Sequence, residues 1–372
     1  MLTDADLRIA RDAGIAVYAG RLILDARTPI TDAVLAQVQA KTAHPVPHEL
    51  VSLWRTSFGG RLDYDLRADL GGVDVPLSCT ELFHPDSDGY RDLWGWIDHE
   101  REIGDVERLE WLPFAGFEYL DRVYAGRDGI VAWQQGLPPA WEIRPGDRAG
   151  RIADSVDDLF AQLALERDPW SDEDPDTGES LRDAVDDLDA NGHPDLAHKL
   201  RTLVRSAVLD WRAAVESGAV RTDRRLRRLA LHNAAAHDDV RLLDRLAALG
   251  VDPAEEVGSS LTPIDVAVQR GGARAAQWLL ARGVPVTNAL RVGAHAVTLE
   301  LARELLARGA RPSLEAAAGA VRNPDLAVLE LLAEHTPDRA AVARRLRDLA
   351  QWSKVDNTRA AALRDLARRL GA

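Results

Sequence analysis

The segment WLLARGVP at residues 278–285 decides the fold of the C-terminal half, because related segments recur along the chain. They are RLAALGVDP at 245–253, LLARGARP at 305–312 and LLAEH at 331–335. Gly250, Gly283 and Gly309 are separated by 33 and 26 residues, and the equivalent His335 follows after another 26. Recurrence at periods of roughly 20–50 residues indicates stacked repeats. Each glycine is expected to end a helix in the left-handed conformation, which only glycine adopts at little cost.

The segment LTPIDVA at residues 261–267 resembles ankyrin repeats. It is similar to the family's Thr-Pro-Leu-His-x-Ala signature, with Asp265 at the usual histidine position, and ALHNAA at 230–235 is similar to the same helix in the preceding repeat. The resemblance covers about residues 224–337 and implies that Pro263 starts a helix. It also implies a fold that binds proteins by surface shape. Spacings of 26 residues leave room for two helices per repeat, without the projecting β-hairpin.

The N-terminal half carries mixed helix and strand signals. Residues 31–43 and 48–57 have apolar residues on one helical face, and short alternating segments separated by Gly, Pro and Asp fill 61–141. Apolar runs within 123–133 flank the sequence GRDG, which is a hairpin signal. Ser155 opens a further helix with a capping-box pattern. Helices combined with consecutive strands predict an α+β domain.

A composition break at residues 168–178, DPWSDEDPDTG, separates the two halves, since it is acidic, contains two prolines and lacks apolar periodicity. The predicted organisation is therefore an α+β domain with helices packed on a mostly antiparallel sheet, followed by an all-α solenoid. The predicted boundaries are a helical extension over 1–29, the α+β domain over 30–165, an acidic linker over 166–180, connecting helices over 181–223, and ankyrin-like repeats with a helical cap over 224–372.

Four motifs of the N-terminal half lie in a defined order, namely PVPHELVSLW at 45–54, FGG at 58–60, WLPFA at 111–115 and IADSVDDLF at 152–160. In these motifs residues 30–165 resemble the SUKH superfamily, the fold shared by a fungal cell-wall-synthesis regulator and many bacterial immunity proteins. Val46 and Val156 replace the family's usual Leu and Phe. The resemblance implies a small α+β domain that recognises another protein. In bacteria that partner is typically a secreted toxin, often a nuclease.

Charge is distributed unevenly along the 372 residues, whose net charge is −14. Residues 1–165 hold 16 Lys/Arg and 28 Asp/Glu, a net −12, and residues 166–220 hold 6 and 14, a net −8. Residues 221–372 hold 24 and 18, a net +6. The acidic segments should repel nucleic acid and attract basic proteins. The alternative is that the acidity only keeps the protein soluble.

The remaining composition argues against a membrane or secreted protein. The N-terminal sequence is charged throughout and has no apolar signal-peptide core, and no run of 18 uncharged apolar residues occurs. Cys79 is the single cysteine, so an intrachain disulfide framework and a cysteine-based zinc site are excluded. We therefore expect a cytoplasmic protein, and we expect Cys79 to be a buried structural residue.

Motifs for catalysis and cofactor binding are missing from the sequence. It contains no G-x-S-x-G, G-x-x-x-x-G-K-[ST] or H-E-x-x-H, and no G-x-G-x-x-G after a strand. His84 to Asp88 reads as an ordinary turn. His193 and His198, like His232 and His237, are five residues apart, whereas helical metal ligands need spacings of three or four. We expect no enzyme activity, no cofactor and no metal.

One acidic run with tryptophans beside it is the candidate partner-binding site. Trp94 and Trp96 would share a face if their segment were extended, and carboxylates beside aromatic anchors suit the arginine- and lysine-rich surface of a nuclease. The alternatives are that these tryptophans belong to the core and that the charge run is a solvated face. The candidate residues are Trp94, Trp96, Asp98, Glu100, Glu102, Asp105, Glu107, Glu110 and Trp111.

The sequence therefore predicts a non-enzymatic bacterial immunity protein that occludes a cognate, basic toxin domain. Acidic residues would speed the encounter and apolar anchors would slow release. The alternative is an intracellular scaffold or regulator without a toxin partner, since both halves resemble adaptor folds. A third class is an enzyme whose site is assembled from polar residues that share no motif. The sequence leaves the oligomeric state open.

Overall fold

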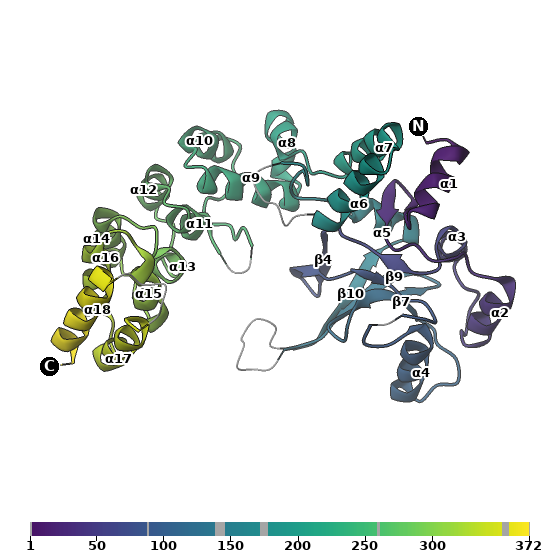
Figure 1. Cartoon of the computed structure of the whole chain (residues 1–372), viewed down its shortest axis with the longest axis horizontal. Helices are drawn as coiled ribbons and strands as arrows, with labels where there is room; N and C mark the ends of the chain where they lie inside the picture. The colour runs from purple at the N-terminus through teal and green to yellow at the C-terminus, as the bar shows by residue number, and fades with distance from the viewer. Residues whose placement is uncertain are drawn as a thin grey trace. The chain divides into compact units, whose positions relative to one another are not determined.

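The computed structural model describes residues 2–87, 89–137, 146–171, 178–258, 261–351 and 357–371. The chain divides into two compact units, Met1–Leu209 and Asp210–Ala372, called unit 1 and unit 2 below. Both units are drawn in Figure 1. Residues 172–177 of the predicted linker lie outside the described residues, as does Asp88 of the turn after His84.

Unit 1 contains groups of consecutive strands separated by helices. Its elements are α1 (Asp4–Asp12), β1 (Ala16–Tyr18), β2 (Arg21–Ile23), α2 (Asp32–Ala40), α3 (His48–Thr56), β3 (Gly60–Arg61), β4 (Leu66–Leu70), β5 (Val73–Leu77), β6 (Glu81–Leu82), α4 (Leu93–Gly104), β7 (Leu112–Phe117), β8 (Asp121–Gly126), β9 (Gly129–Gln134), β10 (Arg148–Ala153), α5 (Val156–Gln162), α6 (Glu179–Ala190) and α7 (Pro194–Arg205).

The strands of unit 1 confirm the predicted α+β class with antiparallel pairing. Six strands form one sheet in the order β10-β9-β8-β7-β6-β3, while β1–β2 and β4–β5 form separate two-stranded sheets. The hairpin predicted over 123–133 is present, with Gly126 paired to Gly129 at its turn. The helix predicted at Ser155 is α5, and the Ser155 side chain accepts a hydrogen bond of 3.0 Å from the Asp158 amide.

The core of unit 1 extends beyond the predicted domain of residues 30–165 at both ends. At the N-terminal end, Ile15, Leu22 and Ile23 are buried, so residues 1–29 supply a helix and two strands to the core and do not form an extension. At the C-terminal end, α6 and α7 share the same cluster of buried residues. Their buried side chains are Leu181, Val185, Leu188, Leu196, Leu200 and Val204. The boundary between the units therefore falls after Leu209, about where α8 begins.

The described part of the predicted linker is packed against α6 and α7. The Trp170 indole donates a hydrogen bond of 3.0 Å to Asp186, and the guanidinium groups of Arg201 and Arg205 lie 5.3 and 5.5 Å from the centre of its ring. Arg205 also pairs with Asp168 at 2.9 Å. These contacts attach residues 168–170 to α6 and α7, although the sequence predicted a free linker there.

The described secondary structure of unit 2 is helical, apart from an isolated β-bridge between Gly258 and Leu261. Its elements are α8 (Trp211–Ser217), the 3-10 helix η2 (Ala219–Arg221), α9 (Arg224–Ala236), α10 (Val240–Ala248), α11 (Pro263–Gln269), α12 (Ala273–Ala281), α13 (Ala289–Gly293), α14 (Leu299–Ala307), α15 (Leu314–Gly319), the 3-10 helix η3 (Ala320–Arg322), α16 (Leu326–His335), α17 (Arg339–Leu349) and α18 (Asn357–Leu370).

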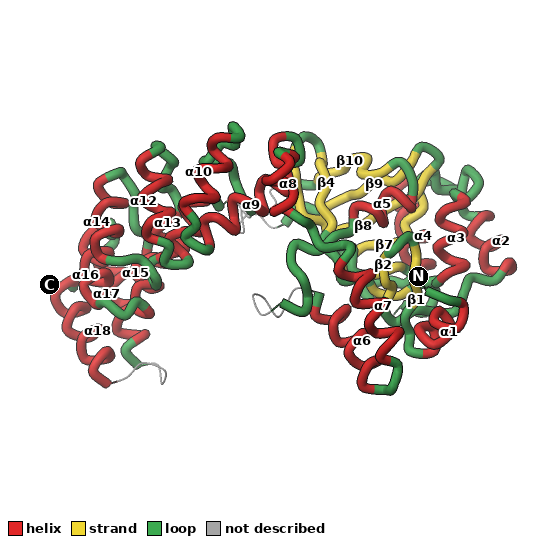
Figure 2. The backbone as a smooth tube through the Cα atoms, turned by 90° about the horizontal axis from the view of Figure 1, so that it is seen from above, coloured by secondary structure: helices red, strands yellow, loops and turns green. Residues whose placement is uncertain are grey.

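The helices of unit 2 stack as successive antiparallel pairs in two layers, as Figure 2 shows. One layer is formed by the odd-numbered helices, in which each contacts the next from α9 to α17. In the other layer, α10 contacts α12, α14 contacts α16, and α16 contacts α18. The predicted stack of helices is therefore present, and α17 and α18 are its last described members. The first repeat is longer than the others, because residues 249–262 separate α10 from α11.

The recurrent glycines end helices in the predicted conformation. Gly250, Gly283 and Gly309 have φ angles of +81°, +76° and +93°, in the left-handed region. The equivalent position in the last repeat differs, because α16 ends at His335 and the next residue, Thr336, has φ −76°. The Thr336 hydroxyl donates a hydrogen bond of 2.8 Å to the Leu332 carbonyl, which supplies the helix end with a different partner.

We expect Gly283→Val to destabilise unit 2 by more than about 1 kcal/mol, because a β-branched residue would be forced into the left-handed region. No heavy atom lies within 4 Å of the position of the added Cβ, so backbone strain would be the main cost. Gly283→Asn is the matched control, since asparagine tolerates this region better than valine. Thermal melting measures both variants. Equal midpoints for wild type and the valine variant would contradict the assignment of Gly283 as a helix-ending residue.

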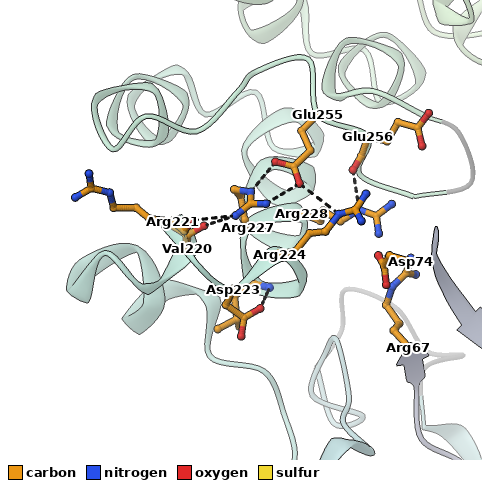
Figure 3. Close-up of polar contacts among 11 residues, drawn as sticks. Arg67, Asp74, Val220, Arg221, Asp223, Arg224, Arg227, Arg228, Glu255 and Glu256 are labelled. Atoms are coloured by element: carbon orange, nitrogen blue, oxygen red, sulfur yellow. Dashed lines mark hydrogen bonds and ion pairs between the residues drawn. The ribbon is translucent and has the colours of Figure 1, made fainter. Parts of the chain in front are cut away.

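An arginine cluster on α9 fixes the long segment of the first repeat. Arg227 contacts both carboxylate oxygens of Glu255 at 2.6 and 3.1 Å, and Arg224 lies 3.8 Å from the same carboxylate. Arg228 donates a hydrogen bond of 2.7 Å to the Glu256 carbonyl. These contacts are drawn in Figure 3. Because Arg227 and Glu255 are both largely buried, the bidentate pair holds the loop before α11 against α9.

Candidate protein-binding surface

The acidic run 98–110 begins in helix α4, and this overturns the extended conformation considered for Trp94 and Trp96. The Asp92 side chain accepts a hydrogen bond of 2.6 Å from the Gly95 amide and caps the N-terminus. Asp105 ends the helix with φ +48° and ψ 45°, a left-handed conformation that aspartate tolerates better than most residues. In a helix, residues two positions apart point about 200° away from each other. Trp94 and Trp96 therefore do not share a face.

The tryptophans of the candidate set are core or half-buried residues. Trp96 is 1% exposed and stacks on Phe83 with ring centres 5.7 Å apart. Trp94 is half-buried and packs against the same core. Trp111 is half-buried too, with its ring against Gly126, where an added Cβ would lie 2.4 Å from the indole. Trp96 is thus removed from the candidate surface, because the side chain is enclosed by unit 1.

Glu100 belongs to an internal polar network. Its carboxylate lies 3.1 Å from Nε of Arg122 and accepts a hydrogen bond of 3.0 Å from the Tyr124 hydroxyl. The Arg122 guanidinium lies 4.6 Å from the centre of the Trp96 ring and 4.1 Å from that of Trp133. Both charged groups are largely buried, so Glu100 neutralises Arg122 and is not part of the free acidic face.

The remaining carboxylates of the run are exposed. They are Asp98, Glu102, Asp105, Glu107 and Glu110. Asp98 is partly neutralised, since it lies 3.2 Å from Arg101 and 3.7 Å from Lys41. Among the described residues, no ion pair is formed by Glu102, Glu107 or Glu110. These three carboxylates leave the local charge negative.

Two large apolar side chains are exposed within this acidic stretch. Ile103 is 68% exposed and Val106 is 44% exposed. Arg101 fixes the backbone beneath them, since its side chain donates a hydrogen bond of 2.8 Å to the Glu107 carbonyl and its own carbonyl accepts one of 3.1 Å from the Val106 amide. The exposed residues of the segment 98–110 are together called the α4 face below. It combines exposed apolar side chains with exposed carboxylates around them.

Sequence reasoning missed Ile103 and Val106 as exposed apolar residues. Leu93, Trp96 and Ile97 are buried at spacings of three and four, which is the period of a helix with one apolar face. That period places Ile103, seven residues after the buried Trp96, near the same stripe, and Val106 lies beyond the end of α4, so neither exposure follows from it. The exposed aromatic pair Tyr90 and Tyr119, whose ring centres are 5.5 Å apart, was missed as well. These two residues are 29 positions apart, and no local pattern connects them.

The second acidic surface of unit 1 is a cleft of about 780 Å³ between α1 and α6. Asp12, Asp183 and Asp187 line it, and Asp25 there pairs with Arg61. Across the described residues, no group of three or more histidine, cysteine, aspartate or glutamate side chains is arranged to hold a metal ion. Cys79 is buried, and burial raises the pKa of its thiol to about 12, so the thiolate is disfavoured.

Comparison with known proteins concerns unit 2. A family model described as ankyrin repeats (many copies) matches residues 231–280. The match runs from α9 to α12 and includes the predicted signature at 261–267. None of the curated proteins compared with the chain matches it. Within the described ranges, we find no helix with the length and apolar character needed to cross a membrane.

The ankyrin segment explains what the unusual aspartate does. Pro263 occupies the first turn of α11, and the Asp265 carboxylate accepts hydrogen bonds of 2.9 and 3.0 Å from the amide and hydroxyl of Thr262. Asp265 is thus the acidic member of a capping box. Burial raises the pKa of its carboxyl group. Because ankyrin repeats bind proteins through surface shape, the match supports a protein-interaction role for unit 2.

Proposed function

We propose that this chain is a non-enzymatic protein-binding protein whose α4 face docks a basic partner protein. The observation that carries the proposal is the pair of exposed apolar side chains, Ile103 and Val106, within a rim of exposed carboxylates. Exposed apolar groups gain free energy when a partner covers them. The unpaired carboxylates Glu102, Glu107 and Glu110 would steer a positively charged surface toward the same place.

The finer proposal is that the chain is a bacterial immunity protein and the partner a basic toxin domain, neutralised by occlusion. The resemblance of residues 30–165 to the SUKH superfamily supports it, together with the charge of unit 1. That unit holds 40 Asp/Glu and 21 Lys/Arg, a net −19. Unit 2 would contact the same toxin or a second protein. The alternative is a scaffold or regulator, whose basic partner is a protein other than a toxin.

Charge reversal on the α4 face is the direct test. Changing Glu102, Glu107 and Glu110 to lysine should slow association with the partner by about one or two orders of magnitude and flatten its salt dependence. The dissociation rate should change less, since these carboxylates lie on the rim. The measurement is association kinetics at several salt concentrations, against a partner recovered with the tagged full chain from its own host and then purified.

The matched control is the reversal of Asp12, Asp183 and Asp187 to lysine, which makes the same change in net charge in the α1–α6 cleft. Figure 1 shows α4 at the opposite end of unit 1 from α1 and α6. We expect the control variant to associate at close to the wild-type rate. If the control variant associates slowly and the α4 variant at the wild-type rate, the partner docks in the cleft. If both variants associate at the wild-type rate, electrostatic docking by unit 1 is rejected.

A further inference from the structure

We infer that Tyr90 and Tyr119 form a stacking site for an arginine side chain of the partner. The inference rests on the proposed binding of a basic protein and adds a second contact, distinct from the α4 face. Tyr90 is 57% exposed and Tyr119 is 41% exposed, although their rings contact each other. Large aromatic side chains that are both exposed and paired are common anchors for binding partners.

The cluster beneath the pair already holds two guanidinium groups against aromatic rings. Arg122 lies between Trp96 and Trp133, at 4.6 and 4.1 Å from their centres. Arg91 lies 5.7 Å from the centre of the Trp96 ring and 5.6 Å from that of Tyr90. Tyr90 also contacts Trp96 directly, with ring centres 6.0 Å apart. The tyrosine pair thus forms the exposed edge of a cluster in which aromatic rings already hold guanidinium groups.

Carboxylates lie near the tyrosine pair, beside the positive charge of Arg91. Glu118 is exposed and precedes Tyr119 in the chain, at the turn between β7 and β8. The Glu81 carboxylate lies beside Gly89, the residue before Tyr90, since a Cβ added there would be 2.7 Å from its oxygen. The surrounding unit is strongly acidic, with a net −19. An aromatic pair flanked by carboxylates suits an ionised side chain better than a neutral apolar one.

Arginine fits better than lysine for two reasons. Its guanidinium is planar and weakly hydrated, so it stacks on a ring with little loss of hydration, whereas the compact ammonium of lysine is strongly hydrated. Both cations that stack within the cluster, Arg91 and Arg122, are arginines. The partner's contact residue is therefore assigned as an arginine, set beside the region that meets the α4 face.

The test uses labelled nona-arginine and nona-lysine peptides as probes, titrated with the full chain near physiological salt and followed by fluorescence anisotropy. Replacing both Tyr90 and Tyr119 with leucine should weaken nona-arginine binding about fivefold or more, because the aromatic faces are lost. Nona-lysine binding should change less than about twofold, since an ammonium gains less from stacking. The double phenylalanine variant should bind like wild type, because it keeps both rings.

Each other outcome has a defined meaning. The stacking site is overturned if the leucine variant loses the same affinity for both peptides, or if it loses affinity for neither. A third outcome is that the wild type binds deca-proline, the leucine variant does not, and nona-arginine binding is unchanged. That result would identify a site for apolar peptides and would also overturn the arginine-stacking site. The variant with Glu102, Glu107 and Glu110 changed to lysine separates this inference from the proposed function, because it should weaken both basic peptides alike. If the triple lysine variant binds both peptides like wild type, while the leucine variant behaves as expected, docking at the α4 face is rejected and the stacking site is retained.

Discussion

A fragment that ends at residue 165 should fail to fold, whereas a fragment that ends at residue 209 should fold cooperatively. Helices α6 and α7 contribute six large apolar side chains to the core of unit 1. Each such side chain contributes about 1.5–3 kcal/mol when it is buried. Their sum is comparable with the whole net stability of a domain, about 5–15 kcal/mol.

Circular dichroism and urea denaturation of the two fragments measure this difference. The fragment 1–209 should show a single steep transition, and the fragment 1–165 a shallow one or none. A matched control is the fragment 1–209 cleaved by a protease between residues 171 and 178, whose two pieces should remain associated through the shared core. Cooperative unfolding of 1–165 with the stability of 1–209 would restore the boundary expected from the sequence.

Replacing Trp96 with alanine should destabilise unit 1 by about 3–5 kcal/mol, because a fully buried indole is removed and leaves a cavity. Loss of the ring also removes the surface on which Arg122 stacks. Had Trp96 been an exposed contact residue, the same change would have raised the dissociation rate of the partner and left stability unchanged. The two roles therefore predict different measurements.

Differential scanning calorimetry of the full chain measures the effect of Trp96→Ala, as a lower temperature for the transition of unit 1 alone. Trp94→Ala is the control, since Trp94 is only half-buried and should cost less. An unchanged transition of the Trp96 variant, combined with faster release of the partner, would contradict the buried position of Trp96.

The solenoid could be predicted from the sequence because its determinants are local. Gly250, Gly283 and Gly309 end helices through a backbone conformation that one residue type favours, so their spacing reports the repeat directly. Pro263 and Thr262 mark the start of α11 in the same local way. The hairpin around Gly126 and Gly129 was predictable for the same reason.

The extent of unit 1 could not be predicted in this way, because it depends on tertiary packing. The sequence shows that α6 and α7 each have an apolar face that must be buried. It does not show whether that face packs on the core of unit 1 or on the repeats of unit 2. The acidic segment between Leu165 and α6 looked like a boundary by composition alone. Trp170, packed between Arg201 and Arg205, shows that part of it is anchored.

The surface position of the charge run was predictable from the sequence, but its local structure was not. Most of its carboxylates are exposed, whereas Trp94 and Trp96 lie in a helix and not in the extended segment that would have put them on one face. Burial of Glu100 depends on Arg122, which comes from β8 and is 22 residues away in the chain. A partner so distant in sequence leaves no mark near Glu100. The exposure of Ile103 and Val106 does not follow from the helical period, because Ile103 lies seven residues after the buried Trp96 and Val106 follows the end of α4.

Hydrogen–deuterium exchange of the full chain, free and bound to its purified partner, tests the central claim most directly. Docking on the α4 face predicts slower exchange of amides in residues 98–110 in the complex, with unchanged exchange in α1 and α6. Protection confined to residues 210–372, or to α1 and α6, with residues 98–110 unchanged, would contradict the assignment of the α4 face as the docking surface.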